Sequence, residues 1–175
     1  TATNPATPVL TTLNAGTATG AVTLSGINTS AAGATITLGT GNDTYNVGTS
    51  SGADTIVLTS GGNDNIVYTT LAQSGVLMDT VTGFTSGSDF IDLRTFVNPI
   101  NTSAQFKGVK ATFGEAQGAL TATAVSAVFD ASSSILWVDN NADGTLDSRD
   151  FRVKLSGVTS ITATDLKLGS GNTFS

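Results

Sequence analysis

A short repeat built on glycine and aspartate constrains the fold of this chain more than any other feature. Three segments, residues 39–47, 50–58 and 60–68, each place a glycine two residues before an aspartate and a large apolar residue two residues after it. The aspartates are Asp43, Asp54 and Asp64, so the spacing is 11 and then 10 residues. A period this short, with glycine turns between very short strands, is typical of a coil of parallel β-strands.

The repeat also predicts where each side chain lies in such a coil. The apolar residue points inward and stacks on its counterpart in the next coil, and the aspartate points into the turn. If two repeats complete one coil, Asp43 and Asp64 stack on one edge while Asp54 lies on the opposite edge. Stacked carboxylates repel one another unless a cation lies between them. The three aspartates are therefore candidate metal ligands, and the alternative is a metal-free solenoid with aspartate turns.

The distribution of charge favours a hard cation as the partner of these carboxylates. The chain has 13 acidic residues, of which only Glu115 is a glutamate. Up to Leu93 there are six aspartates and no basic residue; from Arg94 onward, seven acidic residues face seven basic ones, so the net charge of −6 lies in the first half. The absence of a basic patch argues against nucleic-acid binding. Cysteine and histidine are both absent, which leaves oxygen ligands and makes calcium the leading candidate.

Residues 139–150 form the sharpest local motif, because they match the twelve-residue calcium loop. Oxygen donors stand at its alternating positions, glycine occupies the sixth position, and Asp150 closes the loop where the consensus has glutamate. The predicted ligands are Asp139, Asn141, Asp143, Thr145 through its backbone carbonyl, Asp147 and Asp150. Strands rather than helices are expected on both sides, so the loop would pin a β-connection. The alternative is an acidic turn without a metal.

The order of these motifs resembles the RTX (repeats-in-toxin) family, whose nonapeptides follow the pattern Gly-Gly-x-Gly-x-Asp-x-apolar-x. Residues 79–93 and 155–168 resemble the passages that follow the repeats in RTX proteins exported by type I secretion. The resemblance implies a parallel β-roll that takes up calcium outside the cell, with an uncleaved C-terminal export signal. It carries over best to Asp43 and Asp64 and less securely to Asp54. Asp92 is a further candidate ligand, at the end of the roll.

The expected fold is mainly β. A linker-like segment, residues 1–20, precedes a short parallel β-roll with calcium-binding turns at 21–93, and a β-rich C-terminal cap with one or two short helices and the secretion region fills 94–175. Strand character is clearest at 125–129, 135–138 and 151–155. Helical spacing of Phe106, Val109 and Phe113 predicts a helix within 104–118.

Two classes of parent protein fit these observations. The first is a type I-secreted surface protein, similar to surface-layer (S-layer) proteins or adhesins, in which calcium drives folding and assembly. The second is a secreted protease, lipase or toxin, for which this chain is the folding and export module. Neither assigns catalysis to the chain itself. We expect part of a longer polypeptide at the cell surface, with calcium and the type I secretion machinery as partners, and self-association or a surface polysaccharide as further ones. No apolar run is long enough for membrane insertion.

Overall fold

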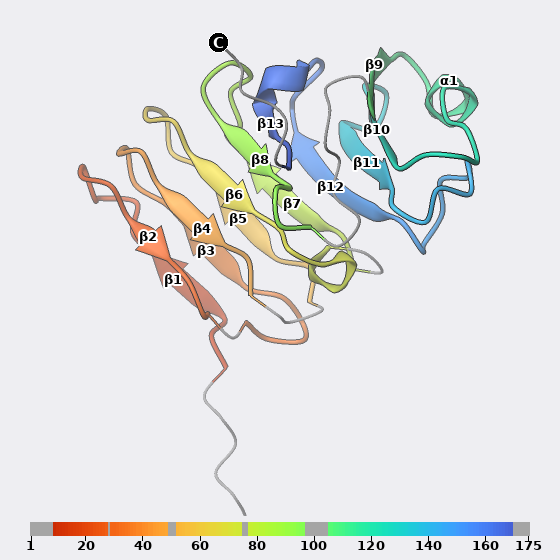
Figure 1. The fold of residues 1–175 in the computed structure, drawn as a ribbon. Helices are drawn as coiled ribbons and strands as arrows, with labels where there is room; N and C mark the ends of the chain where they lie inside the picture. Colours follow the sequence, from red (N-terminus) through yellow and green to blue (C-terminus); the bar gives the residue numbers. More distant parts are fainter. Residues whose placement is uncertain (1–8, 28, 49–51, 75–76, 97–104, 170–175) are drawn as a thin grey trace, which may run out of the picture.

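The chain winds into about five coils, and the strands of successive coils pair in parallel to form two β-sheets that face each other. The computed structural model describes residues 9–27, 29–48, 52–74, 77–96 and 105–169. Each coil contributes one strand to each sheet (Figure 1). The parallel strands of the first sheet are β1 (Thr12–Asn14), β3 (Thr35–Thr37), β5 (Thr55–Val57), β7 (Asp79–Thr82) and β12 (Phe151–Ser156). Those of the second sheet are β2 (Thr23–Leu24), β4 (Thr44–Asn46), β6 (Asn65–Val67), β8 (Phe90–Asp92) and β13 (Leu166–Lys167).

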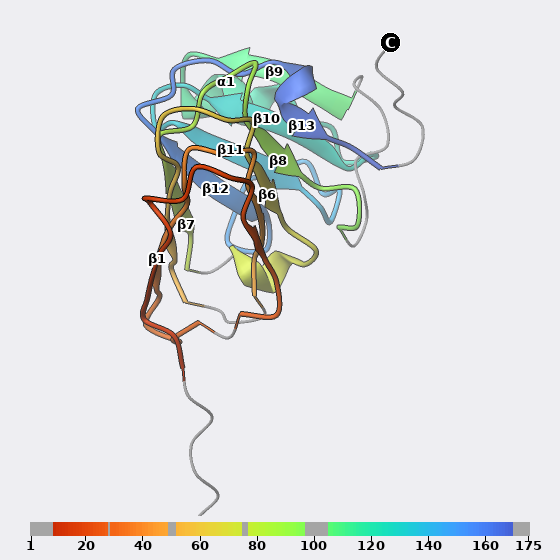
Figure 2. The same cartoon turned by 90° about the vertical axis from the view of Figure 1, so that its left-hand side faces the viewer.

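The repeat determines which side chains fill the coil. The middle residue of each three-residue strand points inward and is aligned with the middle residue of the next strand: Tyr45 with Ile66, and Ile66 with Ile91. All three are fully buried, and burial of each such side chain stabilises the fold by about 1.5–3 kcal/mol. The flanking residues are mostly threonine and asparagine and point outward. Figure 2 looks along the coils from the β1 end and shows the two sheets on opposite sides of this core.

An insertion separates the fourth coil from the last one. Between β8 and β12 the chain forms β9 (Phe106–Lys110), α1 (Phe113–Gly118), β10 (Ser126–Asp130) and β11 (Ile135–Asp139). β11 pairs antiparallel with both β10 and β12, and β12 pairs parallel with β7, so the insertion extends the first sheet to eight strands. A second small core packs α1 against this extension; its buried members are Ala116, Leu120, Val128, Trp137 and Leu146.

The strands expected at 125–129, 135–138 and 151–155 are confirmed as β10, β11 and β12. The helix expected within 104–118 is wrong in its first part: residues 106–110 form β9, which pairs parallel with β10. Gly108 takes a φ of +79° there, which no right-handed helix accommodates. The remaining part of that helix is α1, which Thr112 caps by accepting the N–H of Glu115.

The segment before Gly20 was expected to be irregular, and from residue 9 onward it is not. Leu13 of β1 is aligned with Ile36 of β3, so this segment supplies the first strand of the coil. Residues 1–8 lie outside the described part of the chain. Two 3₁₀ turns complete the described elements, η1 (Leu71–Gln73) and η3 (Ala163–Asp165). Thr162 is the N-cap residue of η3.

Candidate functional site

One edge of the coil carries a column of buried aspartates. Oδ1 of Asp43 accepts the backbone N–H of Val22 at 2.7 Å, Oδ1 of Asp64 accepts that of Asp43 at 2.9 Å, and Oδ1 of Asp89 accepts that of Asp64 at 2.9 Å. Each carboxylate thus binds the backbone of the preceding coil at the aligned position. The predicted stacking of Asp43 and Asp64 on one edge is confirmed. The hydrogen bond from the Asp43 backbone N–H to the Asp64 carboxylate joins the two residues, and this bond needs no cation.

The second oxygens of this column differ in their surroundings. Oδ2 of Asp43 accepts the N–H of Gly39, and Oδ2 of Asp89 accepts the N–H of Thr85, both at 2.8 Å. Oδ2 of Asp64 is buried and has no hydrogen-bond partner in the part of the chain that the structure describes. Burial raises the pKa of Asp64 to about 6, against the lowering effect of the Asp43 N–H and with added repulsion from its two neighbours in the column. This unpaired oxygen is a feature that a cation would stabilise.

The opposite edge carries a second column, Asp54 and Asp79. Oδ1 of Asp54 accepts the N–H of Ala34, and Oδ1 of Asp79 accepts the N–H of Asp54, both at 2.8 Å. The hydroxyl of Tyr68 donates to Oδ2 of Asp79 at 3.1 Å. Burial is the main cause that raises the pKa of Asp79 to about 8. Both carboxylate oxygens of Asp79 thus already have a hydrogen-bond partner, the Asp54 N–H and the Tyr68 hydroxyl, which suits a structural role.

The 139–150 loop joins the end of β11 to the start of β12, so strands flank it as expected. Asp139 accepts two loop N–H groups, that of Asp143 at 3.2 Å and that of Gly144 at 2.9 Å. Oδ2 of Asp150 accepts the N–H of Asp147 at 3.0 Å, whereas its Oδ1 is buried and has no partner among the described residues. Asp139 and Asp150 are both fully buried. The loop therefore brings its first and last predicted ligands into the interior.

The charges of this loop are only partly balanced. Arg149 forms ion pairs with Asp143 at 2.9 Å and with Asp147 at 2.6 Å, both on the surface. Within the described part of the chain, neither Asp139 nor Asp150 has an ion pair. The pKa of Asp150 is raised to about 6 by burial first, and then by repulsion from the other three carboxylates of the loop. Burial likewise raises the pKa of Asp139.

The donor set of the loop fits a hard divalent cation. All six predicted ligands offer oxygen, and two of them are buried carboxylates that have no ion pair with any described residue. Among the described residues, however, no three carboxylates are already arranged around a common metal position. The carboxylates of the loop instead accept N–H groups of the loop itself, and a bound cation would have to draw them toward a shared centre.

Asp92 lies apart from both columns and from the loop. Its carboxylate accepts hydrogen bonds from Nη2 of Arg94 at 2.6 Å and from Nδ2 of Asn65 at 3.1 Å, on the outer face of the second sheet. The hydrogen bonds and charge of Arg94, and the bond from Asn65, lower the pKa of Asp92 despite the opposing effect of its burial.

Sequence reasoning did not place Asp79, Asp89 and Asp165 in these networks. Asp89 does show the signal of the repeat, with Gly87 two residues before it and Ile91 two after it. Oδ1 of Asp165 accepts the N–H of Gly87 at 2.7 Å and so joins the last coil to the fourth. The coil from Asp64 to Asp89 takes 25 residues, whereas the coil from Asp43 to Asp64 takes 21. This longer coil hides the period of the repeat in the sequence.

A parallel solenoid with aspartate-lined turns is the class of protein that this geometry defines. The model of the family "Peptidase M10 serralysin C terminal" matches residues 14–168. The chain therefore belongs to this family, the RTX-type β-roll region that forms the non-catalytic C-terminal part of serralysin-type proteins. The match covers both aspartate columns and the 139–150 loop. No curated protein sequence matches the chain significantly. None of the described helices has the length and apolar character needed to cross a bilayer.

Proposed function

We propose that this chain is the calcium-binding structural C-terminal module of a bacterial protein that a type I system exports to the cell surface. The parent is an S-layer or adhesin-like protein, and the module folds and assembles when it meets extracellular calcium. The aspartate-lined solenoid and membership of the serralysin C-terminal family support the calcium-binding part of this proposal.

The buried pair Asp139 and Asp150 carries the proposal. A carboxylate that loses its water on folding needs a compensating charge or hydrogen bonds, and Oδ1 of Asp150 has neither among the described residues. Calcium takes six to eight oxygen ligands, carboxylates and backbone carbonyls among them. Asp139, Asn141, Asp143, the carbonyl of Thr145, Asp147 and Asp150 would hold the ion, which would neutralise the buried charges.

The aspartate columns are the second set of proposed ligands. Asp43 and Asp64 on one edge and Asp54 on the other lie in the turns of the coil, where Oδ2 of Asp64 has no partner. Asp92 is left out of the proposed ligand set, because Arg94 and Asn65 already occupy its carboxylate.

Calcium would control when the module folds. In a calcium-poor cytoplasm, the desolvation and mutual repulsion of these carboxylates oppose folding, and an unfolded chain suits a narrow export channel. Outside the cell, an ion that binds only the folded state stabilises it by RT ln(1 + [L]/Kd), which is about 2.7 kcal/mol when its concentration is 100-fold above Kd. Binding free energy then becomes folding free energy.

The second candidate is a module of the same design that serves the folding and export of a secreted protease, lipase or toxin. The family description, which names serralysin peptidases, favours this parent. The two candidates share the calcium mechanism and differ in what the rest of the polypeptide does. The complete sequence of the parent separates them: a zinc-protease motif favours the second, and further threonine-rich β-repeats favour the first.

A calcium titration tests the shared mechanism. After EDTA treatment, far-UV circular dichroism and thermal unfolding are recorded for the wild type, Asp150→Asn and the charge-matched control Glu115→Gln. Calcium is expected to raise Tm of the wild type and of the control strongly, with a much smaller rise in Asp150→Asn, and magnesium is expected to fail as a substitute. Equal responses of all three proteins, or no response at all, would overturn the assignment of the loop.

A further inference from the structure

The outer face of the second sheet bears a groove of about 680 Å³, and most of the described residues that line it are polar or charged. It lies over β4, β6, β8 and β13, and the residues that follow β6 and β8 close one side of it. Its volume is within the range of small-molecule binding sites. None of the proposed calcium ligands lines it.

The register of the sheet explains why polar groups converge there. Asn46, Val67, Asp92 and Lys167 occupy aligned outward positions on four neighbouring strands. Adjacent strands are about 4.8 Å apart, so this row places an amide, a valine side chain, a carboxylate and an ammonium group on successive strands. Thr44 and Asn65 form part of a second row beside it. Among the described residues that line the groove, Val67 is the one with an aliphatic side chain.

Asp92 organises the positive end of the groove. It is 2% exposed and holds Arg94 through Nε at 3.0 Å and Nη2 at 2.6 Å, while Asn65 donates to the same carboxylate. The Arg94 side chain itself is 57% exposed. The buried carboxylate therefore fixes the direction of a guanidinium group that still faces solvent.

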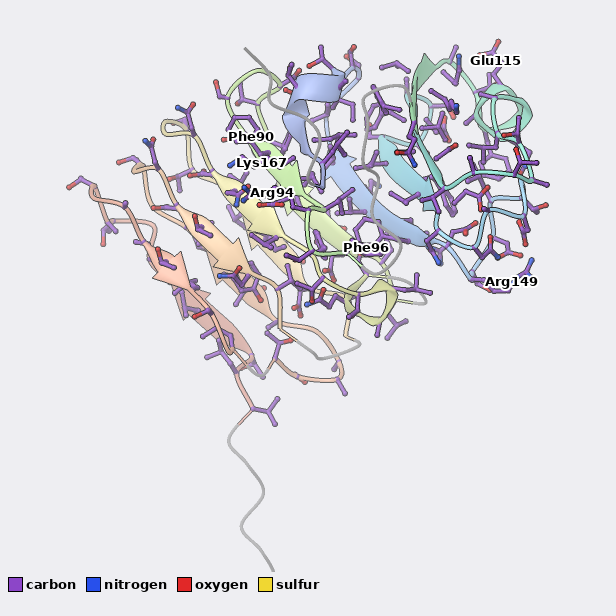
Figure 3. The ribbon with its side chains drawn as sticks, in the orientation of Figure 1. Phe90, Arg94, Phe96, Glu115, Arg149 and Lys167 are labelled. Carbon is purple, nitrogen blue, oxygen red and sulfur yellow. The ribbon has the colours of Figure 1, made fainter. Side chains whose placement is uncertain are left out.

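Lys167 adds a second cation to this end. Its Nζ lies 4.2 Å from the centroid of the Phe90 ring, a cation–π contact that orients the ammonium group. Figure 3 shows Phe90, Lys167 and Arg94 grouped beside β8. Within the described residues Lys167 has no ion pair, and its side chain is half-buried. The three charged groups Asp92, Arg94 and Lys167 thus carry a net positive charge on a chain whose net charge is −6.

We infer that this groove binds an acidic saccharide, with Lys167 and Arg94 holding its carboxylate and the threonine and asparagine side chains holding its hydroxyl groups. Hydroxyl and amide groups held on neighbouring strands are suited to the many donors and acceptors of a sugar ring. A half-buried ammonium group that has no ion pair among the described residues gains from an anionic ligand, because part of its desolvation has already occurred. This inference goes beyond the proposed function and does not depend on which metal the loop binds.

Titration of the ¹⁵N-labelled, calcium-saturated protein with trigalacturonate tests the inference by NMR. Binding is expected to shift the amide signals of Thr44, Asn65 and Lys167, and the neutral galactose trimer is expected to bind at least several-fold more weakly. Lys167→Gln should weaken trigalacturonate binding roughly tenfold, while Lys154→Gln, a lysine on the outer face of the other sheet, should leave it unchanged. Thr44→Val should also weaken binding, and its matched control Thr80→Val should not.

Four outcomes would overturn the inference. They are the absence of binding at millimolar trigalacturonate, equal binding of the neutral trimer, signal shifts confined to the 139–150 loop, and equal effects of the two lysine substitutions. A separate titration uses inorganic phosphate. If phosphate displaces trigalacturonate and binds at least as tightly, the groove is an anion site and not a saccharide site. Circular dichroism of each variant confirms that the coil remains folded.

Discussion

The backbone N–H of Asp43 donates to Oδ1 of Asp64 at 2.9 Å, although 21 residues separate them along the chain. Asp64 repeats the relationship with Asp89 over 25 residues, and Asp54 repeats it with Asp79 on the opposite edge. A carboxylate at this position therefore satisfies a buried backbone donor of the neighbouring coil. The aspartates of the repeat have a structural role that needs no cation.

Replacing Asp89 with alanine separates this structural role from any metal role. The N–H groups of Asp64 and Thr85 would lose their acceptors. A buried donor left unsatisfied, here the Asp64 N–H, costs about 1–3 kcal/mol, and the part-buried Thr85 N–H costs less because water can reach it. The free energy of unfolding, measured by urea denaturation in EDTA, should fall by on the order of 2–4 kcal/mol. Asp89→Asn keeps one acceptor oxygen and should lose about half as much. A loss seen only when calcium is present would mean that Asp89 acts through the metal.

The stability of the calcium-free protein should fall as pH rises from about 4 to about 8. Asp64 and Asp150, each with a pKa raised to about 6, and Asp79, raised to about 8, bind protons more tightly when folded than when unfolded. Their contribution is largest below the unfolded pKa of about 3.9 and is lost as pH passes each folded pKa. The lowered pKa of Asp92 acts in the opposite sense, but only at pH values below this window.

Thermal unfolding across this pH range in EDTA measures the effect, and Asp79→Asn serves as the comparison. Asparagine keeps the acceptor for the Asp54 N–H without a charge, so the variant should show a shallower slope over the whole range. The loss should be greatest in proportion between about pH 6 and about pH 8, where Asp64 and Asp150 no longer contribute. A profile that rises with pH in EDTA would contradict the raised pKa values. Saturating calcium should flatten the wild-type profile, because calcium favours the ionised carboxylates.

Two glycines with nearly the same backbone angle should respond very differently to alanine. Gly62 has a φ of +85° and Gly87 a φ of +86°. A Cβ on Gly62 would lie 2.1 Å from the backbone oxygen of Gly41 in the preceding coil, whereas a Cβ on Gly87 would meet nothing within 4 Å. Gly87→Ala should therefore cost only the conformational penalty of about 1 kcal/mol, and Gly62→Ala several kcal/mol more. Equal losses in denaturant midpoint would mean that the coils do not approach as closely as 2.1 Å implies.

The coil itself could be predicted from the sequence, because the spacing of Asp43, Asp54 and Asp64 encodes it directly. Glycine turns, inward apolar residues and aspartates in the turns act over a few residues each, so the local pattern and the tertiary structure agree. The same holds for the 139–150 loop, where the spacing of donors and the position of Gly144 are local features.

The remaining contacts depend on partners that are distant along the chain. β9 has helical spacing at Phe106 and Val109, but pairing with β10 decides its conformation, and local patterns do not report such pairing. The partners of Asp92 could not be foreseen either, since Arg94 and Asn65 reach it through a turn and a neighbouring strand. Likewise, nothing in the repeat indicates that β12 and β13 return to form the last coil after the insertion.

Gln117 should link the 139–150 loop to helix α1. Its Oε1 accepts the N–H of Leu146 at 2.8 Å, and its Nε2 donates to the carbonyl oxygen of Gly144. These two backbone groups flank Thr145, whose carbonyl is a proposed calcium ligand. Gln117 therefore holds this side of the loop in place, and Gln117→Ala should lower the apparent calcium affinity about 10-fold as well as the stability in EDTA.

Gln105→Ala is the matched control for this prediction, because Gln105 also makes a side-chain bond to a backbone carbonyl, that of Val125 at 2.8 Å, outside the loop. Removal of either amide should cost about 1–3 kcal/mol of folding free energy in EDTA. Only Gln117→Ala should also shift the calcium midpoint, measured by isothermal titration on the folded protein at a temperature well below Tm. A calcium midpoint that moves equally in both variants would show that Gln117 contributes to general stability alone, and that α1 and the loop are not coupled through it.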